Sequence, residues 1–166
     1  MIQKFGYEDL TDAQTPWPAN YDLPKTWEPL NHETKSYIKK TGSLNWLSMG
    51  TRPDITYTVS RLCEANAGPS KEHLLLLKHL FRYLKKTASL GIQFGGSDYI
   101  DSDLKLITYA DASHADHLLT RHSTGGHVVF LAGGPVLWKS KRQTFVTLSS
   151  TKAEFTNLTL VILSSQ

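Results

Sequence analysis

Two acidic residues in the second half of this 166-residue chain are spaced as metal ligands could be. Asp111 follows a stretch, 104–110, whose alternating apolar residues predict a β-strand, and Glu154 lies near the third position of a predicted helix. A carboxylate at a strand end and another on a helix over the same sheet can converge on a divalent cation, because Mg²⁺ prefers oxygen ligands. Metal-assisted phosphodiester cleavage needs further ligands and an oriented water. The spacing alone leaves two solvated acids as the alternative.

Basic residues form a second group of candidates around the predicted strands: Arg121, Lys139, Lys141 and Arg142. They could contact the phosphates of a nucleic acid, which would make binding sensitive to salt. The alternative is that they are solvated, or that they protect an exposed sheet edge from pairing with other chains.

Four histidines, at positions 114, 117, 122 and 127, lie close in sequence to Asp111 and Asp116. The imidazoles of His114 and His117 could bind a transition metal, but no further pattern typical of zinc accompanies them. Surface histidines are the simpler interpretation.

A sheet and a helix are needed to position these candidates, and the second half of the chain predicts both. The expected strands cover 104–110, 126–131 and 136–140, with a hairpin at Gly133-Gly134-Pro135 and an extended continuation over 145–148. Ser149 or Ser150 can cap the closing helix, whose expected apolar face is formed by Phe155, Leu158, Val161 and Ile162.

The first half of the chain predicts three short helices that pack as a small bundle. The first covers about 32–49, the second starts at a Thr51 cap and ends at Gly68-Pro69, and the third starts at Ser70. The third helix carries an apolar stripe of Leu77, Leu80, Phe81 and Leu84.

The resulting fold class is α+β: a helical bundle followed by an antiparallel three-stranded sheet with one helix. We expect an extended, Pro-rich leader over 1–30, a helical region over 31–90 and the sheet region over 91–166. Trp17 and Trp27 either pin the leader to the surface or belong to a frayed end. Trp46 and Trp138 are expected in the cores.

Composition limits the class of protein. A hydrophobic fraction of 40% and a charged fraction of 20% are ordinary for a globular protein, and the net charge of +3 does not by itself indicate nucleic-acid binding. Cys63 is the only cysteine, so an intramolecular disulfide and a cysteine-based zinc cage are excluded. Because no signal peptide or membrane-spanning run is recognisable, we expect an intracellular protein, cytoplasmic or nuclear, without a membrane partner.

The motifs resemble copia-type retrotransposon polyproteins over nearly the whole chain, and they follow the order of that family. Upstream, the resemblance is carried by Thr51-Arg-Pro-Asp-Ile55 and Arg82-Tyr-Leu-Lys-Lys-Thr87. Downstream, it is carried by Tyr109-Ala-Asp-Ala-Ser113, Arg121-His-Ser-Thr-Gly125-Gly, Leu131-Ala-Gly-Gly-Pro135-Val-Leu-Trp138 and Leu148-Ser-Ser-Thr-Lys-Ala-Glu154-Phe.

The resemblance implies a connection region like that after a reverse transcriptase, followed by the N-terminal part of a ribonuclease H domain. Asp111 then matches the catalytic aspartate of the first strand and Glu154 the helix glutamate, together a half-site for Mg²⁺ or Mn²⁺. None of the twelve residues after Glu154 is acidic, so the later catalytic acids of the family have no counterpart there. We therefore expect a catalytically incomplete, truncated domain that is inactive as an isolated monomer.

Two functions follow from this resemblance. The first is a retrotransposon-derived ribonuclease H-like fragment that binds an RNA–DNA hybrid or other RNA. The second is a repurposed interaction module, of host or effector type, that binds a protein through its sheet edge and helix face. Self-association is expected with either function, and completion of the site by a second polypeptide is a third possibility.

Overall fold

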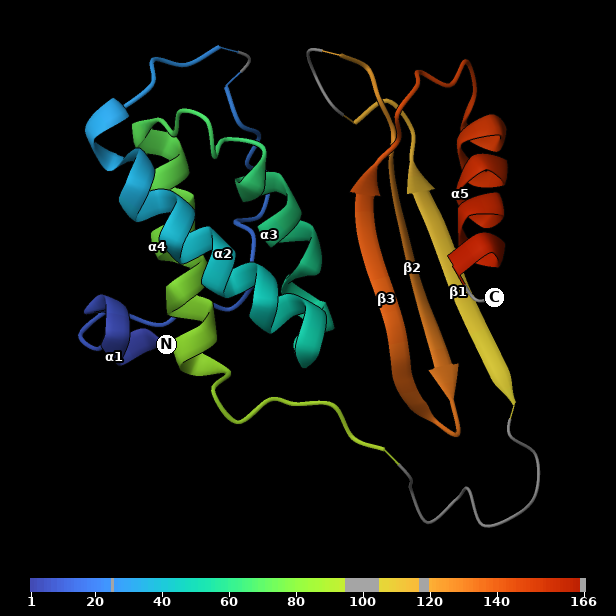
Figure 1. The fold of residues 1–166 in the computed structure, drawn as a ribbon, viewed down its shortest axis with the longest axis horizontal. Coiled ribbons are helices and arrows are strands. Elements are labelled where there is room, and N and C mark those ends of the chain that lie inside the picture. The colour runs from blue at the N-terminus through green and yellow to red at the C-terminus, as the bar shows by residue number, and fades with distance from the viewer. Residues whose placement is uncertain (25, 95–104, 117–119, 165–166) are drawn as a thin grey trace. The chain divides into compact units, whose positions relative to one another are not determined.

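The computed structural model describes residues 1–24, 26–94, 105–116 and 120–164, with the side chains of the last helix as far as Thr159. It divides into two compact units, Met1–Gly91 and Ile92–Gln166. Helices make up the first unit, and an antiparallel sheet with one helix makes up the second (Figure 1). The α+β class predicted from the sequence is confirmed. No helix in the described part of the chain is long and apolar enough to cross a membrane.

The helical unit follows the predicted order of elements, but the second predicted helix ends at Cys63, before the predicted end at Gly68-Pro69. After the short α1 (Ile2–Phe5) come η1 (Asn31–Glu33), α2 (Thr34–Gly50), η2 (Pro53–Ile55), α3 (Thr56–Cys63) and α4 (Lys71–Lys86). The predicted stripe of α4 is buried, and it packs with apolar residues of the preceding elements into one core: Tyr37, Leu44, Ile55, Val59, Leu62, Leu77, Leu80, Phe81 and Leu84. The hydroxyl of Tyr37 donates to the carbonyl of Leu62 across this core at 2.8 Å.

The turn between α2 and α3 is built around a buried ion pair. The predicted Thr51 cap is wrong, because the residue directly before η2 is Arg52. Arg52 is buried, with only 4% of its surface exposed. Its guanidinium donates to both carboxylate oxygens of Asp54, at 2.9 and 2.7 Å, and to the carbonyl and hydroxyl of Thr87 at the end of α4. Burial by itself would raise the pKa of Asp54, but hydrogen bonds from Arg52 and Tyr83 outweigh it and hold the pKa below its usual range.

The start of α4 is capped as predicted by Ser70, whose backbone N–H donates to Nδ1 of His73 in a capping box. His73 is buried, and burial lowers its pKa, so the ring stays neutral and can accept this hydrogen bond at neutral pH. The ring of Trp27 lies edge-on to His73, with 4.7 Å between ring centroids, and its indole N–H donates to the carbonyl of Gly68. The N-terminal segment is thus pinned at this end.

Basic side chains of α4 hold the rest of the N-terminal segment. Arg82 donates to the carbonyl of Thr11 at 2.7 Å, and Lys85 donates to the carbonyl of Leu10 at 2.8 Å. Trp17 packs against the helical core. Of the two alternatives for residues 1–30, the pinned surface segment is the one observed.

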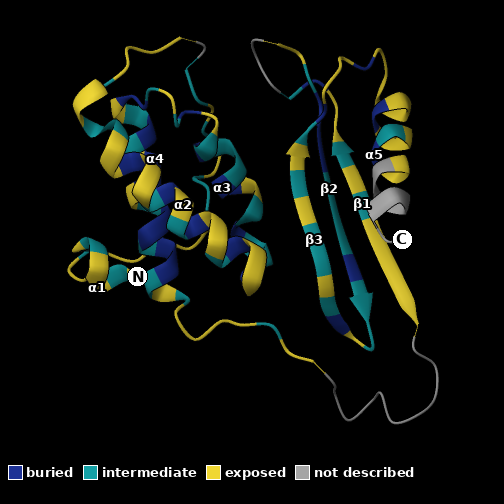
Figure 2. Cartoon of the chain, viewed as in Figure 1, coloured by how far each residue is buried: buried dark blue, intermediate teal, exposed yellow. Residues whose placement is uncertain are grey.

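The sheet unit has the strand order β1-β2-β3, formed by β1 (Leu106–Ser113), β2 (Thr124–Leu131) and β3 (Gly134–Arg142). The hairpin between β2 and β3 is observed, but its turn lies one residue earlier than predicted, at Ala132 and Gly133, both with positive φ, and Gly134 and Pro135 already belong to β3. The closing helix α5 (Ser150–Ser164) lies along β1 and β2 (Figure 1). Much of β1 is exposed, as Figure 2 shows.

Several local expectations for this unit need correction. β1 continues to Ser113, so Asp111 lies inside the strand instead of after it. The segment 145–148 bends and is no strand. Glu154 is the fifth residue of α5, because Ser149 caps the helix by accepting from the N–H of Lys152, which holds the third position.

Apolar side chains were also misplaced by the sequence pattern. Phe155 and Leu158 are 66% and 46% exposed, whereas Ala153 and Asn157 are the buried residues among the described side chains of α5, those up to Thr159. The side chains of Val161 and Ile162 lie outside the described part of α5. Trp46, expected in the core, is 76% exposed on α2. Its helix buries Tyr37, Thr41, Leu44 and Ser48 instead, on the face toward α3.

The Arg52–Asp54 pair should dominate the stability of the helical unit. We expect Asp54→Asn to lower the free energy of unfolding by about 3 kcal/mol, because the substitution leaves a buried guanidinium without its counter-ion. This loss is at the lower end of the range for breaking a buried ion pair, because 25% of the Asp54 side chain is exposed. Urea unfolding, followed by the helical circular dichroism signal, measures the loss. The exposed Asp22 provides the matched control, and equal stability of Asp54→Asn and Asp22→Asn would contradict the assignment.

Candidate functional site

Asp111 lies on the face of the sheet that α5 leaves open. Its cross-strand partner is Gly126, and directly opposed residues of an antiparallel pair project to the same face. A Cβ atom built on Gly126 would meet nothing closer than the carbonyl of Lys139 at 3.8 Å, so this face is uncovered at that point. Asp111 itself is exposed.

The opposite face at the same level is occupied by Asn157 of α5. Its side-chain amide donates to the carbonyls of Asp111 and Gly126, at 2.7 and 2.9 Å. The neighbouring Gly125 has no side chain to keep the amide away: a Cβ atom there would lie 2.4 Å from Oδ1 of Asn157. Asn157 therefore fixes the position of α5 over β1 and β2.

Glu154 lies one helical turn before Asn157 and is exposed. The adjacent Ala153 is fully buried, and its carbonyl accepts from the side-chain amide of Gln143 at 2.8 Å. The side chain of Asp111 thus projects from the face opposite α5, whereas Glu154 lies on α5 itself. Asn157 connects the helix to β1 through the carbonyl of Asp111. Among the described residues no three His, Cys, Asp or Glu side chains are grouped so that they could hold a metal ion. The half-site for Mg²⁺ or Mn²⁺ stays a prediction.

Small polar side chains fasten the loop before α5 to the end of β1. The hydroxyls of Ser123 and Thr147 are 2.9 Å apart, and both residues are buried. Nε2 of His114 lies 3.0 Å from the carbonyl of Thr147, so this histidine has a structural contact. Asp116 accepts from the hydroxyl of Thr124 at 3.0 Å. His117 lies outside the described residues.

The basic candidates are divided by the fold. Lys139 and Lys141 are exposed on β3 opposite His127 and Gly125, hence on the face that carries α5. Arg142 pairs with Thr124, and Arg121 is exposed in the loop before β2 with a φ of 55°. The two lysines therefore share one surface of β3, whereas Arg121 belongs to the loop before β2.

A cavity of about 160 Å³ lies between β3 and α5. We name it the basic groove. The residues that line it include His127, Lys139, Lys141, Gln143, Phe145 and Asn157. Arg142 also lines it, and no carboxylate of the described residues does. Burial, and then the charge of Lys139, lower the pKa of His127, so the ring is neutral at neutral pH.

Two polar atoms of the basic groove have no hydrogen-bond partner within the described structure. They are Nε2 of His127 and Oε1 of Gln143, and both are buried. Sequence reasoning did not single out Gln143, Asn157 or Gly125. One signal was available: Asn157 interrupts the apolar residues of α5 at the position four after Ala153, where a buried polar residue indicates a specific partner.

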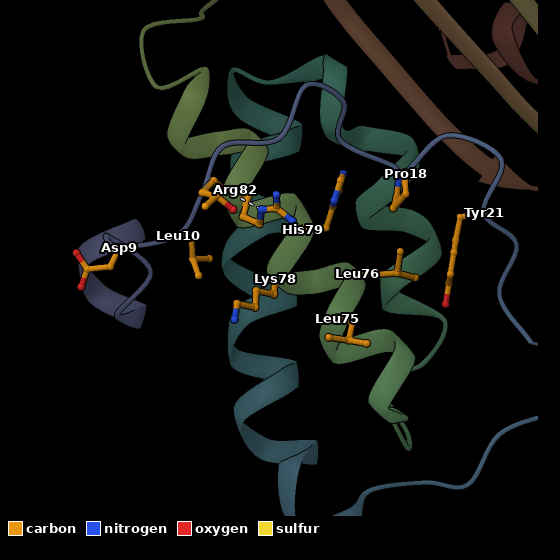
Figure 3. A pocket seen from close by; sticks show the side chains of 10 residues that line it. Asp9, Leu10, Pro18, Tyr21, Leu75, Leu76, Lys78, His79 and Arg82 are labelled. Atoms are coloured by element: carbon orange, nitrogen blue, oxygen red, sulfur yellow. Dashed lines mark hydrogen bonds between the residues drawn. The ribbon is translucent and has the colours of Figure 1, made fainter.

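The helical unit has a larger hollow of about 530 Å³ between the N-terminal segment and α4. Figure 3 shows Leu10, Pro18 and Tyr21 from the segment and Leu75, Leu76, His79 and Arg82 from α4 around it. Nε2 of His79 lies 2.9 Å from the carbonyl of Thr15. His79 and Arg82 thus hold the segment at this hollow, and none of the predicted site residues lines it.

Comparison with known proteins supports the resemblance seen in the motifs. The retrovirus-related Pol polyprotein from transposon TNT 1-94 of Nicotiana tabacum is 33% identical over 161 residues, which cover 93% of this chain and 12% of the polyprotein. The corresponding polyprotein from transposon RE1 of Arabidopsis thaliana is 40% identical over 143 residues, 86% of this chain and 9% of the polyprotein.

A much shorter relative is the secreted RxLR effector protein 161 of Plasmopara viticola, which is 36% identical over 119 residues. The match covers 72% of this chain and 81% of the effector. No protein-family model and no solved structure matches the chain. The chain belongs to the family of copia-type retrotransposon Pol polyproteins, of which it represents a fragment.

The contact between Gly125 and Asn157 can be tested with two neighbouring glycines. We expect Gly125→Ala to lower the free energy of unfolding of the sheet unit by about 1–3 kcal/mol, because the methyl group displaces an amide that two hydrogen bonds hold in place. Gly126→Ala has room for its methyl group and should change stability by no more than about 0.5 kcal/mol. Chemical denaturation of both variants measures the difference.

Adding Asn157→Ala provides the control for mechanism. Removing the amide makes room at position 125, so the double variant should lose less stability than the sum of the two single variants. Strict additivity would contradict a direct clash.

Proposed function

We propose that this chain is a transposon-derived, ribonuclease H-like module whose sheet unit binds nucleic acid through phosphate contacts in the basic groove. The observation that carries the proposal is the lining of the groove, which combines Lys139, Lys141 and Arg142 with no carboxylate from the described part of the chain. Family membership supplies the context, because the motifs of this chain resemble the ribonuclease H region of such polyproteins.

Geometry supports a polymer of phosphates as the ligand. Lys139 and Lys141 are two residues apart on one strand, so their Cα atoms are separated by about 7 Å on one face. Their flexible side chains can therefore contact two successive phosphates, and each contact releases counterions from the nucleic acid. The acids Asp111 and Glu154 do not line the groove.

We do not expect cleavage by the isolated chain. The two family-matched acids are exposed and start from different sides of the sheet, which is a poor arrangement for holding a pair of Mg²⁺ ions. Binding without cleavage is therefore the activity proposed.

Exposed apolar residues favour protein binding as a second candidate function. Leu106, Ile107 and Tyr109 of the edge strand β1 are 56%, 42% and 61% exposed, and Phe155 on α5 is 66% exposed. An exposed edge with apolar side chains can add a strand from another chain. The relative named as a secreted effector fits this candidate. It requires self-association or a protein partner, and a strictly monomeric chain in light scattering at tens of micromolar would argue against self-association.

A salt series tests phosphate binding. We expect the affinity for a labelled RNA–DNA hybrid to fall steeply between low and physiological salt, and the double variant Lys139→Gln/Lys141→Gln to reduce the slope of log K against log salt by about 2. Fluorescence anisotropy measures the affinity. The matched control is Lys35→Gln/Lys39→Gln, which removes two exposed charges from the helical unit. The proposal fails if both double variants change the slope equally or if the chain does not bind.

The same hybrid, incubated with Mg²⁺ or Mn²⁺, reports cleavage. The proposal expects intact substrate with wild-type protein and with Asp111→Asn and Glu154→Gln. Metal-dependent cleavage that both substitutions abolish would overturn the expectation of an inactive chain and would indicate acids contributed by a second polypeptide.

A further inference from the structure

We infer that the basic groove accepts one unpaired nucleotide of single-stranded nucleic acid, with the base in the cavity and its phosphates at Lys139 and Lys141. The inference rests on the proposed function and goes further, because it separates single strands from the hybrid. Three features of the groove carry it: two unpartnered polar atoms, an exposed aromatic ring and the size of the cavity.

The unpartnered atoms indicate more than an anion site. Gln143 is 4% exposed and uses its amide N–H on the carbonyl of Ala153, so Oε1 is left to accept a hydrogen bond. A phosphate group of a nucleic acid has no N–H from which Oε1 could accept a hydrogen bond. The edge of a base carries N–H donors beside acceptors, and it can pair with Oε1 of Gln143 and with Nε2 of His127 together.

The charge state of the groove fits a base edge. Because its pKa is lowered, His127 is a neutral imidazole whose Nε2 either donates or accepts, depending on the tautomer. Both unpartnered atoms are shielded from solvent, so a base reaches them only after side chains that line the groove move aside.

Size and the aromatic ring point to a single base within a polymer. The cavity of about 160 Å³ is smaller than the pockets of about 300–1,000 Å³ that enclose whole small ligands. It suits one unit of a longer molecule. Phe145 lines the groove and is 46% exposed, so its ring is available for stacking on a base.

A base in a duplex cannot use this groove, because its pairing edge is occupied and both its faces are stacked. The surface of a hybrid offers only phosphates to Lys139 and Lys141. Single strands should therefore bind more tightly than a blunt hybrid of equal length.

The test compares three labelled oligonucleotides of equal length with the full chain at one salt concentration: single-stranded RNA, a blunt RNA–DNA hybrid and an abasic single strand. We expect the single strand to bind at least fivefold more tightly than the hybrid and the abasic strand to lose this preference. Phe145→Ala should weaken single-strand binding about tenfold and leave hybrid binding unchanged, as expected for the loss of one stacked base. Phe155→Ala is the matched control, since it removes an exposed phenylalanine outside the groove.

The outcomes separate the two proposals. Equal binding of single strand, abasic strand and hybrid, with Phe145→Ala and Phe155→Ala alike, overturns the inference and leaves phosphate binding intact. If no oligonucleotide binds, an NMR titration decides: a shift of the His127 ring proton with a nucleoside monophosphate, absent with inorganic phosphate, retains the nucleotide site and rejects the proposed function. No shift with either overturns both.

Discussion

The amide of Asn157 decides how α5 lies on the sheet. It donates to two cross-strand carbonyls, those of Asp111 and Gly126, which is possible because Gly125 leaves the necessary space. Most helices that cover a sheet do so through apolar side chains, but here a polar side chain reaches the backbone itself. Because α5 is held over β1 and β2, the same face of β3 stays open, and the basic groove lies along this boundary.

This placement also separates the two sets of charged candidates. Lys139 and Lys141 face the groove beside α5, whereas Asp111 lies on the other face of the sheet and Glu154 is exposed on the helix. The basic side chains that line the groove and the two family-matched acids are therefore not combined in one cavity.

The helical unit is organised by different interactions. Arg52 joins the turn before α3 to the end of α4 through Asp54 and Thr87, and basic residues of α4 hold the N-terminal segment by its carbonyl groups. The motif Thr51-Arg-Pro-Asp-Ile55, which helped to identify the family, thus has a structural reason. Its arginine and aspartate satisfy one another in a buried position, where either alone would be costly.

Local patterns in the sequence were sufficient for the elements themselves: the stripe of α4, the Ser70 cap and the turn at Gly133 each depend on residues close in the chain. They also placed Glu154 on α5, but they set Asp111 just after the first strand, whereas β1 continues through it to Ser113. Only the tertiary structure decided which faces are covered. Helical periodicity predicted that Phe155 and Leu158 would be buried, yet the amide of Asn157 turned Ala153 toward the sheet and left both exposed. A hydrogen bond between residues 46 positions apart has no local signature, because its energy depends on carbonyls that the folded sheet alone brings together.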